Sequence, residues 1–381
     1  PAARLVDVIE RRREKALGTY VQRGKASYVL PADRALGEAI LVPPTDAARD
    51  GDLVKVDITR SPSPNAPPSG AIIGVVDRED PRTEVLEAAY EKGFSESFPA
   101  DVERQASRVG FEIPPEEIAR RRDLRGLRLV TVDGEDARDF DDAIYVEKVK
   151  AGWRLVVAIA DVSHYVRPGE PMDHEALRRT TSVYFPNLVL PMLPERLSNG
   201  ICSLKPQEDR LCMVADMVFA PEGDGARCVD AQIYEGVMRS AARCTYTEVA
   251  AVLAGEQLEH REFLRPDFER MAELTRLLIA TRAERGSIDF DLPEAKVILG
   301  ENGRPARIEK RPRNLAHRIV EEFMLAANEQ VARYFWARGL PTVYRVHGEP
   351  NEEKLEVFLT LARAHGFALE VGDEISGREL N

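Results

Sequence analysis

Acidic side chains crowd one short stretch of the sequence, TVDGEDARDFDDAIYVE at residues 131–147. Its acids fall at Asp133, Glu135, Asp136, Asp139, Asp141 and Asp142. Carboxylates this close repel one another, so unless water surrounds them they need a cation or must stay partly protonated. With no His or Cys nearby, such hard oxygen ligands favour Mg²⁺ or Mn²⁺. The stretch therefore predicts a divalent-metal site.

Two alternatives exist for these acids, a calcium-binding loop and a solvated acidic loop. An EF-hand loop starting at Asp133 would need glutamate at position 144, where the sequence has Ile144. The pattern does not exclude a solvated loop. Such a loop, however, would not usually enclose Phe140 or run directly into the apolar residues Ala-Ile-Tyr-Val. The metal site is the interpretation that the pattern favours.

The segment before the acids reads as short strands divided by turn residues such as Arg23-Gly24 and Asp50-Gly51. Several short strands at this spacing indicate a small all-β barrel or sandwich. An OB-like barrel is one candidate, and barrels of that type often bind single strands. The proline-rich stretch Ser61–Gly70 is expected to form an exposed loop. The expected strands are Leu17–Val21, Ala26–Leu30, Ala39–Val42, Leu53–Ile58 and Ala71–Val76.

Helices are expected on both sides of the acidic stretch. Residues 84–125 look helical and polar, with one helix that starts at Pro114-Pro115 and ends near Gly126. After the acids, Ala143–Val149 and Arg154–Ala160 are predicted to pair as a hairpin, within a larger α/β or α+β unit. Helical periodicity predicts three later helices, at Phe268–Thr281, Leu315–Ala337 (N-cap Asn314, stop Gly339) and Glu352–His365.

Composition limits the classes of protein to which the chain can belong. Its 381 residues are 44% hydrophobic and 31% charged, which fits two or three folded domains. No run of eighteen apolar residues occurs, and the first residues form no apolar signal segment, so we expect a cytoplasmic protein with no membrane span. Four cysteines without a CxxC pair fit a reducing compartment and argue against zinc.

The net charge of −12 argues, taken alone, against a nucleic-acid-binding protein. Positive charge is nevertheless clustered at Arg11–Lys15, Arg120–Arg128 and Lys310–Arg318. Each cluster is either an ordinary solvated face or part of a local basic channel that could hold a phosphate backbone. The total charge therefore leaves nucleic-acid binding open.

Other residues that could do chemistry are weaker candidates. Asp161 and His164 could form a catalytic pair, but a metal site needs no histidine base, so a structural or supporting role is expected. His317 and Glu321 lie one helical turn apart, on a face that is either functional or an ordinary polar stripe. No GxSxG or GxxxxGK[ST] motif occurs, so serine hydrolases and P-loop NTPases receive no support.

The acidic stretch is very similar to the signature of the catalytic RNB domain of ribonucleases R and II. The reading DARDFDDA at residues 136–143 favours the ribonuclease R branch. The resemblance covers about residues 127–372, with order and spacing kept, and residues 15–125 resemble the second cold-shock (OB) domain and linker of the same enzymes. It continues through AIADVSHYV (158–166), TSVYFPNLVLPMLPERLSNGICSLKPQEDRLCMV (181–214), GSIDFDLPE (286–294), NLAHRIVEEFMLAAN (314–328) and YRVHGEP (344–350).

The resemblance implies a 3′→5′ exoribonuclease, and with it an activity, a cofactor and a metal site. Such an enzyme takes the 3′ end of single-stranded RNA into a narrow channel and hydrolyses it processively to nucleoside 5′-monophosphates by a two-metal mechanism. The expected metal is Mg²⁺, with Mn²⁺ as an alternative. Asp133, Asp139 and Asp142 match positions that hold magnesium, and Asp141 matches the aspartate most sensitive to substitution.

Four further residues match positions that contact RNA in the family. Tyr184 and Phe290 match the aromatic residues at the two ends of the stacked nucleotides, and stacking suits a nuclease that ignores sequence. Tyr246 and Glu321 match positions that sense the ribose 2′-hydroxyl, the group that distinguishes RNA from DNA. Without the resemblance, both aromatic residues would be read as core side chains.

The expected fold class is multidomain, with a small all-β OB barrel, linker helices and an incomplete α+β RNB domain. The family's later TSPIRRY-like block, which carries a phosphate-gripping arginine, and its S1 domain are not found in the sequence. We therefore expect an internal fragment of a longer, monomeric protein, and the alternative function is a non-catalytic RNA-binding fragment or module. The expected divisions are 1–14 (tail of a preceding domain), 15–80 (cold-shock domain), 81–126 (helical linker) and 127–381 (RNB domain).

Overall fold

The structure is a computed structural model that describes residues 15–63, 66–287, 292–311, 313–346, 348 and 351–367. This part of the chain forms two compact units. The first unit contains the described residues before Val109, together with Arg167–Pro194 and Glu294–Arg311. The second contains Val109–Val166, Glu195–Pro293 and the described residues from 313 onward. The acidic stretch belongs to the second unit.

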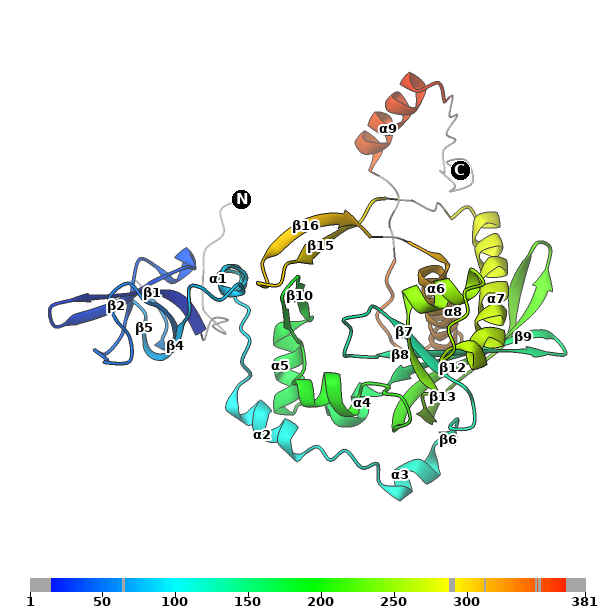
Figure 1. Cartoon of the computed structure of the whole chain (residues 1–381), viewed down its shortest axis with the longest axis horizontal. Helices are drawn as coiled ribbons and strands as arrows, with labels where there is room; N and C mark the ends of the chain where they lie inside the picture. Colours follow the sequence, from blue (N-terminus) through cyan, green and yellow to red (C-terminus); the bar gives the residue numbers. More distant parts are fainter. Residues whose placement is uncertain are drawn as a thin grey trace. The chain divides into compact units, whose positions relative to one another are not determined.

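The first unit begins with a closed five-stranded barrel in the order β1-β2-β3-β5-β4 (Figure 1). Its core is formed by fully buried side chains that include Tyr20, Val29, Ile40 and Val54. Closure brings β1 and β2 so close that a Cβ at Gly18 would collide with the carbonyl oxygen of Leu30. The predicted strands and the OB-like barrel are confirmed. The strands are β1 (Lys15–Arg23), β2 (Ala26–Pro31), β3 (Ile40–Leu41), β4 (Leu53–Arg60) and β5 (Ser69–Val76).

The rest of the first unit consists of short helices and two small hairpins. The helix α1 packs on the barrel strand β1, and α2 packs on α5. Strand β10 pairs with β11, and β15 pairs with β16, both antiparallel. The bounds are η1 (Arg34–Leu36), α1 (Thr83–Glu91), α2 (Ala100–Arg108), α5 (Pro171–Arg179), β10 (Val183–Phe185), β11 (Leu188–Leu190), β15 (Ala295–Leu299) and β16 (Pro305–Lys310).

The helix predicted to run from Pro114-Pro115 to near Gly126 is shorter than expected. It is α3 (Pro115–Arg120), and the backbone turns extended at Arg121, with φ −99° and ψ 157°. The next residues form β6 (Arg122–Asp123), which pairs in parallel with β13. Pairing with a distant strand outweighs local helix propensity, so the prediction of the helix end was wrong.

A seven-stranded sheet in the order β14-β7-β8-β9-β12-β13-β6 forms the frame of the second unit. The predicted hairpin is confirmed as β8 and β9, with Asp142 opposite Ile159. Strands β12 and β13 form a longer hairpin beside β9. The bounds are β7 (Val130–Asp133), β8 (Asp142–Val149), β9 (Gly152–Ala160), β12 (Asp209–Glu222), β13 (Gly225–Arg239) and β14 (Ala242–Thr245).

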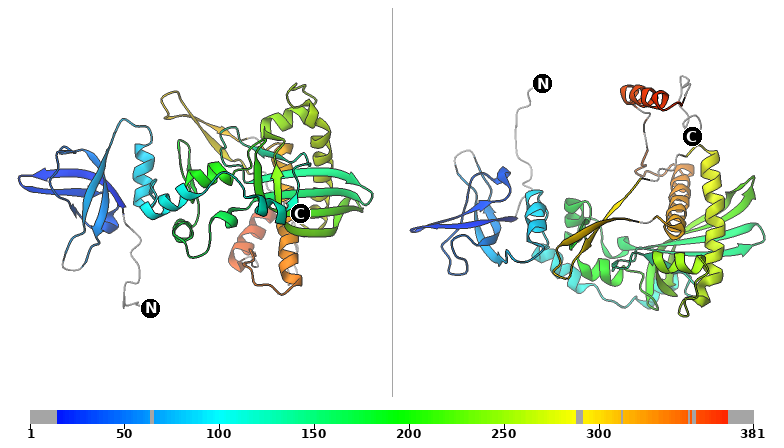
Figure 2. Two further views of the ribbon diagram at one scale, coloured as in Figure 1. Left: turned by 90° about the horizontal axis from the view of Figure 1, so that it is seen from below. Right: turned by 45° about the horizontal axis from the view of Figure 1, so that its top comes forward.

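Three helices, α6 (Tyr246–Leu253), α7 (Arg265–Glu284) and α8 (Leu315–Ala337), cover one face of this sheet (Figures 1 and 2). Phe268 of α7 and Phe323 of α8 are fully buried against strand residues such as Leu155. The helix predicted over 315–337 is confirmed with its N-cap, since the Asn314 side chain accepts hydrogen bonds from the amides of Ala316 and His317. The mixed sheet and helical layer confirm the predicted α+β unit.

The remaining elements of the second unit are short, apart from one helix. They are α4 (Val162–Tyr165), the π-helix η2 (Arg196–Ile201), η3 (Glu262–Leu264) and α9 (Glu352–Ala364). Among the described residues, no helix is long and apolar enough to cross a lipid bilayer. All four cysteines are free thiols.

Candidate active site

The predicted metal ligands lie where two neighbouring strands of the large sheet meet one loop. Asp133 is the last residue of β7 and Asp142 the first residue of β8, and the two strands pair antiparallel through Val130 and Ile144. The loop between them carries the other two aspartates, and the carbonyl oxygen of Asp141 accepts a hydrogen bond of 2.8 Å from the amide of Ala160. The two strands therefore hold both ends of the acidic loop at the same end of the sheet.

Burial and mutual repulsion raise the pKa values of three of these carboxyl groups, those of Asp133, Asp141 and Asp142. Desolvation and the nearby charge of Asp142 raise the pKa of Asp133 to about 7, and desolvation and Asp141 raise the pKa of Asp142 to about 6. Desolvation also raises the pKa of Asp141, and the nearby charge of Asp139 adds to the shift. One oxygen of Asp133, Oδ2, is buried with no hydrogen-bond partner among the described residues. A buried, unpartnered carboxylate oxygen is the kind of group that a cation would satisfy.

The donor set fits a hard divalent cation. Among the residues that the structure describes, no group of three or more Asp, Glu, His or Cys side chains could hold a metal ion as it stands. Mg²⁺ does not require such a group, because it keeps several water ligands and commonly takes one or two carboxylates from the protein. The unpartnered oxygen of Asp133 and the mutual repulsion of the aspartates thus suit Mg²⁺ or Mn²⁺.

Arg243 of β14 fixes the first half of the acidic loop. Its guanidinium donates hydrogen bonds of 2.6 and 2.8 Å to the carbonyl oxygens of Gly134 and Glu135. The Thr247 hydroxyl donates to the Glu135 carboxylate at 2.6 Å. Arg243 was missed in the sequence, where nothing distinguishes it from other strand arginines. Its role comes from the parallel pairing of β14 with β7.

Tyr246, one of the two predicted sugar-sensing residues, lies next to the acidic loop in the fold. It begins α6 directly after Thr245, which pairs with Asp133 in the β14–β7 register. Its ring stacks on His317 of α8, with centroids 4.0 Å apart and an interplanar angle of 11°. Glu321, one turn further along α8, binds Arg313 at 2.9 Å. The structure thus brings α6 and the start of α8 together beside the strand that carries Asp133.

Neither of the two predicted stacking aromatics lies among the described residues of the second unit. Tyr184 lies on β10 in the first unit, where 64% of its surface is exposed, so the alternative of a core side chain is wrong for it. Phe290 lies outside the described residues.

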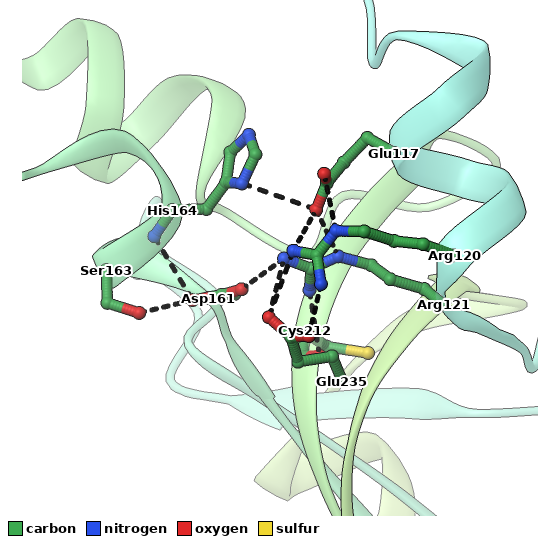
Figure 3. Close-up of polar contacts among 8 residues, drawn as sticks. All are labelled: Glu117, Arg120, Arg121, Asp161, Ser163, His164, Cys212 and Glu235. Carbon is green, nitrogen blue, oxygen red and sulfur yellow. Dashed lines mark hydrogen bonds and ion pairs between the residues drawn. The ribbon is translucent and has the colours of Figure 1, made fainter.

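Asp161 and His164 belong to a network of ion pairs that joins α3 and α4 to the sheet (Figure 3). Asp161 caps α4 and accepts hydrogen bonds of 2.7 Å from both the Arg121 guanidinium and the Ser163 hydroxyl. His164 lies 3.4 Å from a carboxylate oxygen of Glu117, which Arg121 also contacts. These contacts support the structural role expected for the pair.

The contribution of Asp133 and Asp142 to the stability of the metal-free protein is expected to fall as the pH rises from about 5 to about 7. The raised pKa values of Asp133 and Asp142 mean that the folded state binds more protons than the unfolded state across this window. The free energy of unfolding therefore decreases as those protons leave. A divalent cation replaces them, so added Mg²⁺ should raise the melting temperature more near neutral pH than near pH 5.

Thermal unfolding with and without Mg²⁺ across this pH range measures the effect. The double variant Asp133→Asn/Asp142→Asn is the control, since it lacks both titrating groups and should lose the pH dependence of the Mg²⁺ effect. A stabilisation by Mg²⁺ that is equal at all pH values in the wild type would contradict the assignment.

Comparison with known proteins places the chain in a family. A model described as the RNB domain matches residues 121–379, and one described as a cold shock domain matches residues 28–99. Ribonuclease R of Escherichia coli (strain K12) is 42% identical over 384 residues, which cover 99% of this chain and 47% of that protein. The chain thus spans about half the length of the curated relatives that it matches.

Solved structures agree with the family match. Mycoplasma genitalium RNase R, in complex with ribose methylated single-stranded RNA, has a TM-score of 0.83 and 27% identity, covering 98% of this chain and 60% of that chain. Yeast Ssd1, described as a pseudonuclease, shares the fold with a TM-score of 0.67 at 16% identity, covering 96% and 46%. Because the RNB model matches well over half of its residues, the chain belongs to the RNB family, and it resembles ribonuclease R along nearly all of its length.

Proposed function

We propose that the protein is a 3′→5′ exoribonuclease that hydrolyses single-stranded RNA processively to nucleoside 5′-monophosphates. The observation that carries the proposal is the group of four aspartates where β7 ends and β8 begins, namely Asp133, Asp139, Asp141 and Asp142. One of their oxygens, Oδ2 of Asp133, is buried without a hydrogen-bond partner among the described residues. The family membership supports it, because ribonuclease R relatives align along almost the whole chain. The proposed cofactor is Mg²⁺, with Mn²⁺ as a substitute.

In the proposed reaction, the four aspartates hold two divalent ions. When bound, these ions would neutralise the scissile phosphate, lower the pKa of the attacking water and stabilise the leaving oxygen. The protein's own contribution is to keep the carboxylates crowded at the ends of β7 and β8, so that a cation relieves their mutual repulsion. Arg243 holds the loop by its carbonyl oxygens, and Oδ2 of Asp133 has no hydrogen-bond partner among the described residues.

The proposed substrate is the 3′ end of an RNA single strand. A relative, Mycoplasma genitalium RNase R, has been solved with single-stranded and with double-stranded RNA. In this chain, the exposed ring of Tyr184 offers a stacking surface to a base, and Phe290 is proposed for the same purpose. Tyr246 and Glu321 are proposed to read the 2′-hydroxyl, and the protein is proposed to act as a monomer.

A second candidate function is RNA binding without cleavage. The fold does not decide between the two, since yeast Ssd1, a pseudonuclease, has the same fold. The aspartates favour catalysis, because an RNA-binding surface gains nothing from a cluster of negative charges that repel phosphates. The four carboxylates therefore make the nuclease the better supported candidate.

The test of the proposed function is release of mononucleotides from 3′-labelled poly(A) in the presence of Mg²⁺. We expect labelled nucleoside 5′-monophosphate as the first product, and none after EDTA treatment. Binding of poly(A) without any release of label, at all Mg²⁺ and Mn²⁺ concentrations, would support the non-catalytic candidate instead.

Tyr246 and Glu321 are expected to set the preference for RNA over DNA. Replacing both by alanine removes the groups proposed to meet the 2′-hydroxyl, one of them a carboxylate. Hydrogen bonds to charged groups are worth about 1.5–3 kcal/mol, so the ratio of RNA to DNA cleavage rates should fall by about 10–100-fold. The measurement is the rate on matched poly(A) and poly(dA) strands in the full-length protein.

A matched control lies further along α8. Tyr334→Ala/Glu329→Ala removes the same two residue types, and Glu329 is paired with Arg285, the residue that caps the C-terminal end of α7. This control should leave the ratio unchanged. If the Tyr246→Ala/Glu321→Ala variant cuts RNA normally and still leaves DNA intact, these two residues do not read the sugar.

A further inference from the structure

One buried hydroxyl holds the backbone of the acidic loop on both sides of Asp139. The Ser203 Oγ accepts a hydrogen bond of 3.0 Å from the amide of Phe140. The same hydroxyl donates to the carbonyl oxygen of Arg138 at 3.2 Å. A third bond, from the amide of Leu204 to the Phe140 carbonyl oxygen at 2.8 Å, lies directly beside them. Ser203 and Leu204 therefore fix the peptide groups that precede and follow Asp139 and those that lead into Asp141.

Ser203 is itself rigidly held. It is completely buried, just after the π-helix η2. Its carbonyl oxygen accepts a hydrogen bond of 2.8 Å from Nε of Arg210, and the same guanidinium reaches the carbonyl oxygen of Gly200 at 3.3 Å. Arg210 is buried and belongs to β12, a central strand of the sheet. The hydroxyl is thus anchored to the sheet rather than to the loop that it contacts.

The acidic loop needs such an anchor because its carboxylates repel one another. Asp139 and Asp141 are separated by a single residue and carry like charges, so holding the two together costs free energy. A loop of this kind would relax by spreading its carboxylates unless its backbone were tied. Arg243 ties the residues 134 and 135, and Ser203 ties the residues 138 and 140.

We propose that Ser203, anchored by Arg210, is a positioning residue that holds Asp139 and Asp141 in the arrangement that binds the divalent metal. This inference rests on the metal site of the proposed function. Groups that orient metal ligands without touching the metal commonly change metal affinity or activity by about 10–100-fold when removed. Ser203 orients two ligands at once, through the backbone rather than through their side chains.

The test compares Ser203→Ala with Ser198→Ala in the full-length protein. Ser198 lies on the adjoining η2, and its hydroxyl has no hydrogen-bond partner within the described part of the chain, which makes it a matched control. Two readouts are needed: the affinity for Mn²⁺, followed by electron paramagnetic resonance of the free ion, and hydrogen exchange of the amide of Phe140. Ser203→Ala should weaken Mn²⁺ binding by about 10–100-fold and speed that exchange, while Ser198→Ala should change neither.

Ser203→Cys separates positioning from packing. A thiol has nearly the shape of the hydroxyl but is a weak donor and a weak acceptor, so this variant should fold and still lose Mn²⁺ affinity. Unchanged Mn²⁺ affinity in a folded Ser203→Ala or Ser203→Cys protein would overturn the proposal. Faster exchange at Phe140 without any loss of Mn²⁺ affinity would overturn it as well, since the bond would then be structural alone.

These readouts are independent of nuclease activity. If the wild type binds Mn²⁺ but releases no mononucleotide, the proposed function fails while the Ser203 comparison still stands. If the wild type cleaves RNA and Ser203→Ala needs no more Mg²⁺ than the wild type for half-maximal rate, the positioning role fails while the function stands.

Discussion

Asp141→Asn is expected to abolish RNA hydrolysis while RNA binding persists. The substitution removes one carboxylate charge from the proposed metal site and leaves the shape of the side chain almost unchanged. Loss of one electrostatic group aimed at the transition state commonly costs about 10²–10³ in rate, and loss of a bound ion adds to that. Because the change also relieves the repulsion between Asp141 and Asp139, the metal-free protein should not become less stable.

The matched control is Asp136→Asn, the same substitution at an exposed position of the same loop. It should retain the wild-type rate on 3′-labelled poly(A). The measurements are single-turnover cleavage and poly(A) affinity for both variants and the wild type, with thermal unfolding to check the fold. Near-wild-type turnover in Asp141→Asn would show that the aspartate cluster is not catalytic.

Arg121→Met is expected to destabilise the second unit by about 3–5 kcal/mol. The Arg121 side chain is 0% exposed, and it donates to Glu117 at 2.6 Å and to Asp161 at 2.7 Å. Desolvation alone would raise the pKa of Asp161, but hydrogen bonds from Ser163 and Arg121 bring it below its usual value. Removing the guanidinium leaves a carboxylate that is 2% exposed without its cation, and that uncompensated charge carries most of the cost.

The neighbouring arginine supplies the control. Arg120 also contacts Glu117 and Glu235, but its side chain is 47% exposed, so water screens both pairs. Arg120→Met should cost no more than about 1 kcal/mol. Both tryptophans, Trp153 and Trp336, belong to the second unit, so fluorescence during urea unfolding reports on that unit. If both variants lowered the free energy of unfolding by the same amount, burial of the Arg121–Asp161 pair would not be the cause of the destabilisation.

The sequence predicted those helices, strands and loops whose ends depend on residues close together in the chain. Asn314 and Gly339 delimit α8 because an N-cap and a residue with a φ of 62° act within one turn. The strands of the barrel and the hairpin of β8 and β9 follow from short apolar runs divided by turns. The acidic loop was also found in the sequence, because its charge pattern is contained within a few residues.

Features that depend on distant contacts could not be predicted in this way. The basic cluster Arg120–Arg128 looked like either a solvated face or a phosphate channel, yet Arg125 pairs with Asp209 and Arg128 with Asp267. The end of α3 depends on the pairing of β6 with β13. Ser203 carries no local pattern at all, since its partners at Arg138 and Phe140 are more than sixty residues away. Each of these roles depends on contacts between residues that lie far apart in the sequence.

The parallel register of β7 and β14 restricts how this protein can change during evolution. Asp133 pairs with Thr245, and Tyr246 is the next residue in the chain. The backbone hydrogen bonds between β7 and β14 therefore fix the distance between the proposed metal site and the residue proposed to recognise the 2′-hydroxyl. A single inserted or deleted residue in either strand would turn every later side chain to the opposite face of the sheet. New substrate preferences should therefore arise by replacing side chains at the ends of these strands. Changes of length should be confined to the loops that leave the register intact.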